Sequence, residues 1–262
     1  MRERISRILL LLAILGFGIL WYLDPTYSSD ELQNRLLRDV VQRGFGSALF
    51  VCLTFYLGYR VWHRPRVGWA LAFLPALLVA LNNFPVLAWV TGDVTVVRRE
   101  LWWLFLLDCL LIGTFEEIAF RGTIFLALLE KRRQTKRQIF WTTAASSAIF
   151  GLIHLVNLLD GANVGATVLQ VGYSFLIGGM CAIALLRTHN LGFSILLHAI
   201  FDVGGRMVGT VATGKIWNLP TIVITAGLGI LTAVWMVLLL LRVEPSDTDA
   251  FYPTSKDSEQ SE

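Results

Sequence analysis

Two carboxylates and a guanidinium lie close together inside a strongly apolar part of the chain. Residues 115–121 read FEEIAFR, and the residues on both sides are apolar enough to cross a bilayer. Ionisable groups at such depth are costly, so they normally face a protein interior or a wet cavity. Glu117 and Arg121 are four residues apart and can pair along one helix face, whereas Glu116 points about 100° away. This spacing predicts that Glu117 is neutralised within its own helix and leaves Glu116 for another role.

Three later positions have the same character. His154 follows Phe150 by one turn in FGLIH, and Asp202 follows His198 by one turn in HAIFD. A histidine in a membrane helix can simply bond to a neighbouring helix, and Asp202 can simply hold His198 in one tautomer. Together with Glu116, however, these residues put two acids and two imidazoles on three separate apolar helices. We therefore predict one assembled site.

Two kinds of chemistry fit this set of groups. A glutamate in a low-dielectric pocket can act as a general base on water, while the imidazoles and the second acid position that water or stabilise an oxyanion. Alternatively, Glu116, His154 and His198 could ligate a divalent metal such as zinc and leave a place for water. The residues alone do not separate the two mechanisms, so a metal cofactor stays an open alternative.

The composition is that of an integral membrane protein. Of 262 residues, 55% are hydrophobic, and the mean hydropathy is +0.64. The net charge of +3 is spread over loops, which excludes a nucleic-acid face. We predict an all-α fold, a polytopic bundle of about eight transmembrane helices. The predicted spans are 8 to 23, 44 to 62, 67 to 90, 101 to 129, 139 to 159, 163 to 186, 191 to 212 and 216 to 241.

The pattern also suggests three regions and a topology. Residues 1–66 hold the first two spans and a surface helix near 28–43, residues 67–243 hold the core, and residues 244–262 form an acidic tail expected to be disordered. The basic run KRRQTKR at 131–137 indicates a cytoplasmic loop, which places both termini in the cytoplasm if the spans alternate.

The depths of the candidate residues do not agree at first sight. At about 1.5 Å per residue, Glu116 and His154 lie ~20 Å from the cytoplasmic span ends, and His198 lies ~10 Å in. A common site therefore requires kinks or helices that extend beyond the bilayer. The remaining histidines, His63 and His189, fall at span ends and are expected at the interface.

Three short motifs resemble one known family. EEIAFR, FGLIH and HAIFD are similar, in this order, to the EExxxR, FxxxH and HxxxN/D motifs of the CPBP (Abi) family of intramembrane proteases. That family includes type II CAAX prenyl endopeptidases and bacterial bacteriocin self-immunity proteins. The resemblance covers roughly residues 68–205, and the stretches NNFPVLAW and THNLGFSILLHAIFD also look like this family.

The resemblance implies an eight-helix endopeptidase of the bacterial cell membrane that acts on a membrane-anchored or hydrophobic peptide. It implies that Glu116 activates water with His154 as its partner. His198 and Asp202 would support the oxyanion, and the pair Glu117 and Arg121 would be structural, with Phe150 in support. Asp202 departs from the Asn of the prenyl-processing branch, and an ionised aspartate does not donate a hydrogen bond as an amide does.

Two other classes of function use the same residues. A proton-coupled transporter also carries intramembrane Glu, His and Asp, but it would show inverted repeats with broken helices, and no such repeat is evident in the sequence. A non-catalytic immunity or binding protein would keep the fold and act by contact. The sequence does not indicate the natural substrate or the oligomeric state.

Overall fold

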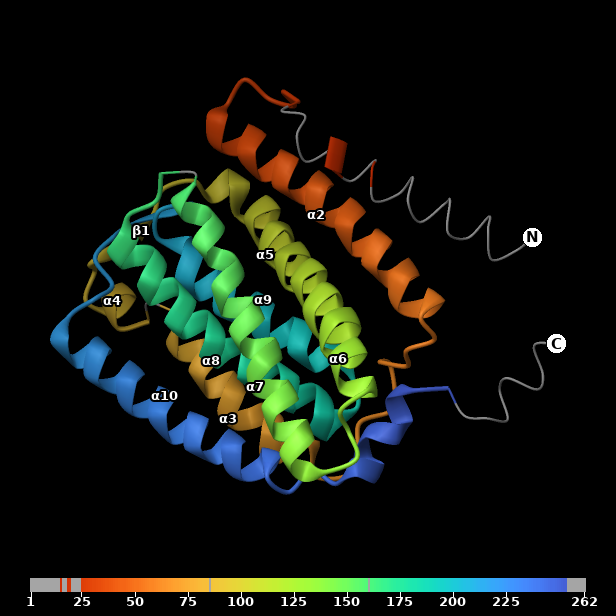
Figure 1. Ribbon diagram of the computed structural model, residues 1–262. Helices are drawn as coiled ribbons and strands as arrows, with labels where there is room; N and C mark the ends of the chain where they lie inside the picture. The colour runs from red at the N-terminus through yellow and green to blue at the C-terminus, as the bar shows by residue number, and fades with distance from the viewer. Residues whose placement is uncertain (1–14, 16–17, 20–24, 85, 160, 254–262) are drawn as a thin grey trace.

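Helices make up nearly all of the structure. The computed structural model describes residues 15, 18–19, 25–84, 86–159 and 161–253, so the first predicted span lies almost wholly outside the described part. Figure 1 shows the helices packed side by side around α8 and α9, with the strand β1 at one end of the bundle. The predicted all-helical class therefore holds for the described residues apart from one sheet of two short strands.

The elements follow one another in chain order. They are α2 (Glu31–Tyr56), α3 (Trp69–Asn82), α4 (Val86–Val90), β1 (Val94–Val96), the 3-10 helix η1 (Arg99–Leu101), α5 (Trp102–Glu117), the π-helix η2 (Ile118–Phe125), α6 (Leu126–Glu130), α7 (Lys136–Leu152), the 3-10 helix η3 (Ile153–Leu158), α8 (Val164–Thr188), α9 (Leu191–Met207), β2 (Ala212–Gly214), α10 (Leu219–Leu240) and the 3-10 helix η4 (Pro245–Phe251). The two strands are antiparallel, with Thr95 opposite Thr213.

Three of the described helical stretches are long and apolar enough to cross a membrane. They are residues 136–158, 164–188 and 219–240. The predicted number of eight spans is not confirmed, because other predicted spans are divided into shorter elements. The stretch 67–90, for example, is split between α3 and α4.

The predicted surface helix near 28–43 is continuous with the second predicted span. Both belong to α2, whose first turn is capped by Asp30, which accepts a hydrogen bond from the Gln33 amide at 2.8 Å. The apolar side of this segment is turned partly toward the rest of the protein. Leu36 is buried in a cluster with Phe105 of α5 and Met207 of α9 because α2 packs along α5.

The turn between α3 and α4 packs against α9. The Asn83 side-chain amide donates to the Phe201 carbonyl at 2.7 Å. Gly204 comes so close to this turn that a Cβ on it would lie 2.7 Å from the Asn83 carbonyl carbon. The end of α3 is thereby held against the part of α9 that carries Asp202.

The helix that carries the two glutamates changes its winding directly after them. α5, η2 and α6 form one continuous helical stretch, in which Ile118–Phe125 is a π-helix. Within it, the Thr123 hydroxyl lies 3.1 Å from the Ile118 carbonyl and 3.0 Å from the Thr54 hydroxyl of α2. π-Helical segments are rare and are found frequently at functional sites.

The buried start of α9 brings Glu117 and His198 to similar levels in the bundle. Leu191 is fully buried, and its Cδ2 would lie 3.3 Å from a Cβ on Gly122 of η2. Counted from this contact, Glu117 lies five residues from Gly122 along its helix, and His198 lies seven residues from Leu191 along α9. At ~1.5 Å per residue these distances agree within a few ångströms.

The recessed turn between α8 and α9 is covered by the loop that follows α2. The Val61 carbonyl accepts from the Leu191 amide at 2.8 Å, and the Asn190 side chain donates to the His63 carbonyl at 2.7 Å. His189 is 7% exposed and its ring centroid lies 5.0 Å from that of Phe251. His189 directly follows the candidate span 164–188, as predicted, but it is covered by other parts of the protein.

Residues 244–253, which we call the C-terminal strap, are ordered, although the sequence predicts disorder from 244 onward. Phe251 and Tyr252 are buried, and the Tyr252 hydroxyl donates to the Leu126 carbonyl at 2.9 Å. The acidic residues of the strap pair with basic residues of the loop after α2, of the loop before α7 and of the first turn of α7. The ion pairs are Asp247 with Arg66, Glu244 with Lys136 and Asp249 with Arg133. Composition indicated polarity here, but these partners are remote in sequence.

Candidate active site

Glu117, Arg121 and His198 form the buried centre of the site. The Glu117 Oε1 atom accepts from Arg121 Nη1 at 2.8 Å and from His198 Nδ1 at 2.7 Å. Glu117 and Arg121 are essentially inaccessible to solvent, and His198 is 5% exposed. The predicted pairing of Glu117 with Arg121 is present, and the same carboxylate also holds the imidazole. Sequence reasoning offered that role to Asp202 as one alternative.

The other side of the His198 ring faces two carboxylates. Its Nε2 atom lies 3.7 Å from Glu116 Oε2 and 3.9 Å from Asp202 Oδ2. The Glu116 side chain is 22% exposed and that of Asp202 15%, so both are more accessible than Glu117. The structure therefore brings Glu116, His198 and Asp202 together, and it places them on the more open side of the ring.

His154 is separated from His198 by an aromatic ring. The Phe150 ring centroid lies 5.4 Å from that of His154 and 5.8 Å from that of His198, with both rings edge to face. The Arg121 guanidinium carbon lies 4.1 Å from the centre of the same Phe150 ring. Phe150 therefore packs against the structural ion pair and both histidines at once.

The hydrogen bond made by one ring nitrogen of each histidine shows which nitrogen is left without a partner. His154 Nδ1 lies 2.9 Å from the Phe150 carbonyl, which can only accept, so Nδ1 carries a proton and Nε2 is the free atom. The same reasoning applies to His198, whose Nδ1 is bonded to a carboxylate. A bare Nε2 lone pair facing two carboxylates would be repelled.

The residues predicted as metal ligands do not form a metal site. Within residues 25–84, 86–159 and 161–253, no group of three or more His, Cys, Asp or Glu side chains is arranged to hold a metal ion. His154 packs against the Phe150 ring, which also packs against His198. The arrangement of Glu116, His154 and His198 thus does not fit a three-ligand zinc centre.

Sequence reasoning missed a second ion pair beside the site, in which only the acid is fully buried. Arg206 Nη1 lies 2.8 Å from Asp108 Oδ2, and the Asp108 side chain is fully buried. Arg206 is one turn beyond Asp202 on α9, so the pair ties α5 to the functional part of α9. The signal was present, because Asp108 is an acid inside the apolar run LLDCLL, as Glu116 is in its own.

Residues 98–204 match the family model described as type II CAAX prenyl endopeptidase, Rce1-like. The predicted family resemblance is confirmed for this segment. The Rce1-like segment runs from the turn before η1 to Gly204 in α9 and contains every predicted site residue from Glu116 to Asp202. The matched segment covers less than half of the chain and is similar to CAAX-type intramembrane proteases. The apolar helices are those expected of an integral membrane protein. Comparisons with curated proteins and with solved structures found no match.

Proposed function

We propose that this chain is an intramembrane endopeptidase that hydrolyses a peptide bond in a membrane-anchored or hydrophobic peptide, with its catalytic core in residues 67–243. The observation that carries the proposal is the contact of 3.7 Å between Glu116 and His198 Nε2, in a ring whose other nitrogen is held by buried Glu117. Such an arrangement puts one accessible carboxylate beside one fixed imidazole inside the Rce1-like segment.

Glu116 takes the role of the base that activates water. Its neighbour Glu117 accepts from two donors and is closed to solvent, whereas the Glu116 side chain is 22% exposed. A general base must reach the water it deprotonates. Of the two adjacent glutamates, Glu116 is therefore the one that can act on a water molecule.

His198 and Asp202 support the developing oxyanion in this proposal. With a proton on Nε2, His198 is an imidazolium that can donate to the oxyanion, and the Asp202 carboxylate lies 3.9 Å from that nitrogen. His154 presents its unprotonated Nε2, because Nδ1 is bonded to the Phe150 carbonyl, and it can accept a hydrogen bond from the attacking water.

Prenylated peptides are one substrate class to test, because the matched family is described as a CAAX prenyl endopeptidase. The experiment compares new peptide N-termini in membrane fractions of cells with the intact protein and with Glu116→Gln, at matched expression. Glu31→Gln serves as the control, since Glu31 lies exposed in the first turn of α2. Glu116→Gln keeps the shape of the site, but its amide cannot accept a proton from water.

We expect specific termini to be present with the intact protein and with Glu31→Gln, and absent with Glu116→Gln. Purified protein in lipid vesicles should then cut a prenylated or an unmodified peptide built on those sequences. Identical profiles for all three proteins would overturn the proposal and favour a role by contact or transport.

A further inference from the structure

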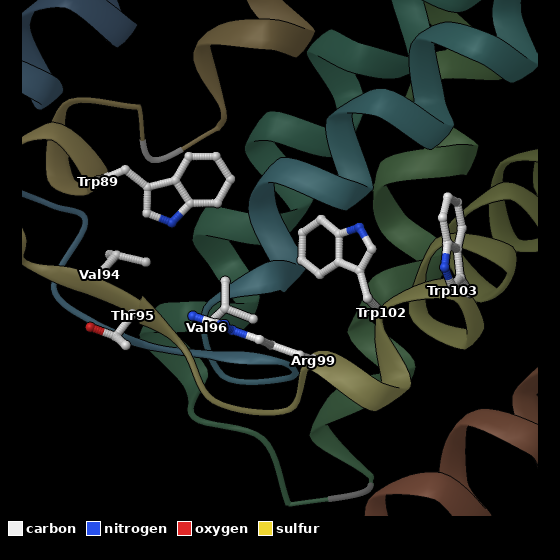
Figure 2. A pocket seen from close by; sticks show the side chains of 7 residues that line it. All are labelled: Trp89, Val94, Thr95, Val96, Arg99, Trp102 and Trp103. Carbon is white, nitrogen blue, oxygen red and sulfur yellow. The ribbon is translucent and has the colours of Figure 1, made fainter.

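A second candidate site lies near the N-terminal end of α5. A pocket of about 570 Å³ lies between α4, β1 and the start of α5. Figure 2 shows Trp89, Trp102 and Arg99 among the side chains that line it, with the Arg99 guanidinium beside Val96 and Trp103 farther away. Figure 1 shows β1 at the opposite end of the bundle from the C-terminal strap. The pocket is therefore remote from the loops that the strap covers.

Arg99 is the charged group of this pocket, and its donors are unused. Its neighbour Arg98 is held by Asp30 at 2.9 Å and by Glu100 at 2.5 Å. Arg99 is exposed and has no ion pair or side-chain hydrogen bond with any residue in the described part of the chain. Since the other lining side chains are uncharged, the pocket presents one free guanidinium among indole rings.

This combination suits an amphiphile with an acidic head. A guanidinium binds a phosphate oxygen pair in a fixed fork, and tryptophan offers an apolar ring together with an N–H donor. Tryptophan is enriched where a membrane meets water. The positive charge of Arg99 opposes a choline or ethanolamine cation, so the head that fits best carries a net negative charge.

An apolar path leads from the pocket along the same helix. Trp103, Leu107 and Leu110 are 79%, 43% and 46% exposed, and their spacing of four and three residues places them on one face of α5. An acyl chain attached to a phosphate at Arg99 can lie along this face. A free phosphate ion would gain nothing from it.

We propose that this pocket binds an anionic phospholipid, with its phosphate on Arg99, its head between Trp89 and Trp102, and an acyl chain along the exposed face of α5. The site is separate from the proposed catalytic residues, so its occupancy can be measured without any protease assay.

The test is lipid binding to purified full-length protein in detergent, followed by native mass spectrometry and by thermal stability. The probes are phosphatidylglycerol, phosphatidylcholine and inorganic phosphate. The variants are Arg99→Gln, which removes the charge, and Trp102→Leu, which removes one ring. Lys215→Gln is the matched control, because Lys215 is an exposed cation beside the β1–β2 sheet that does not line the pocket.

We expect phosphatidylglycerol to bind at least about tenfold more tightly than phosphatidylcholine, because both lipids place a phosphate on Arg99 but only phosphatidylcholine adds a cation that the guanidinium repels. Arg99→Gln should remove that preference and Lys215→Gln should keep it, while Trp102→Leu should weaken both lipids. Equal binding of the two lipids, an unchanged preference in Arg99→Gln, or stabilisation by inorganic phosphate equal to that by the lipid would each overturn the proposal.

Discussion

Glu116 and Glu117 are neighbours in sequence, but their surroundings give them different roles. Glu117 is buried and accepts from both Arg121 and His198. Glu117→Gln would leave Arg121 as a buried charge without its counter-ion, so we expect a loss of about 3–5 kcal/mol in the free energy of unfolding. Glu116→Gln should cost less than about 1 kcal/mol, because this side chain is partly exposed.

Denaturant or thermal unfolding in detergent micelles measures both variants under the same conditions. Equal losses for Glu116→Gln and Glu117→Gln would contradict the assignment of one glutamate to structure and the other to chemistry.

A neighbouring pair of glycines on α8 tests the packing around Arg121. A Cβ on Gly178 would lie 2.9 Å from Arg121 Nη2 and 3.1 Å from Phe150 Cδ1, whereas the nearest atom to a Cβ on Gly179 is 3.6 Å away. Gly178→Ala should therefore destabilise the protein by about 1–3 kcal/mol and lower the proposed activity. Gly179→Ala should be neutral or slightly stabilising. Equal unfolding temperatures for the two variants would show that Arg121 is not confined.

The sequence predicts these residues but not all of their contacts. Spacing within one helix was enough to pair Glu117 with Arg121 and to put His198 and Asp202 on one face. The bond from His198 to Glu117 joins two helices and depends on how far each is displaced along its axis. That displacement is set by contacts such as Gly122 with Leu191, which no local pattern contains.

At the scale of single elements, the C-terminal strap stabilises the fold by packing against core residues that are distant in sequence. Phe251 is fully buried against the core cluster that also contains Leu126 and Leu191. Phe251→Ala should cost about 3–5 kcal/mol in the free energy of unfolding, because it leaves a cavity. Ser246→Ala, at an exposed position of η4, should change it by less than about 0.5 kcal/mol. Thermal unfolding of both variants tests this prediction. Equally small losses of stability would show that the burial of Phe251 does not stabilise the fold.

The π-helix shows where reading elements from sequence reaches its limit. The apolar pattern of residues 101–129 predicted one span and gave no sign of a change in winding. Where the winding changes from α to π, the Thr123 hydroxyl lies within hydrogen-bond distance of the Ile118 carbonyl and of the Thr54 hydroxyl on α2. Threonine is common in membrane helices, so its presence alone does not mark such a segment.

At the scale of the whole molecule, His189 links stability to pH. Burial, together with the nearby charge of Arg66, lowers the pKa of His189 from 6.5 to about 4. Between these values the unfolded chain binds more protons than the folded one, so this residue makes stability fall as the pH drops from about 6.5 to about 4. Above pH 6.5 its contribution to the pH dependence should vanish.

His189→Asn provides the comparison, because the backbone φ of +59° at this position is one that asparagine tolerates. The difference in unfolding free energy between the two proteins, measured across pH 4 to 7, should change by the slope expected for one proton. If the difference did not vary with pH, unfolding would not be coupled to proton uptake by His189, and the prediction would be wrong.

The position of the C-terminal strap has a consequence for biosynthesis. Residues 244–253 follow all the described long apolar helices and leave the ribosome after them. Until then, the turn between α8 and α9 has only the loop after α2 as its cover, and Arg66, Arg133 and Lys136 lack the partners that the strap supplies. A chain whose translation stops before the strap would therefore expose a distinct unfinished face, which a quality-control protease could use to tell it from the completed protein.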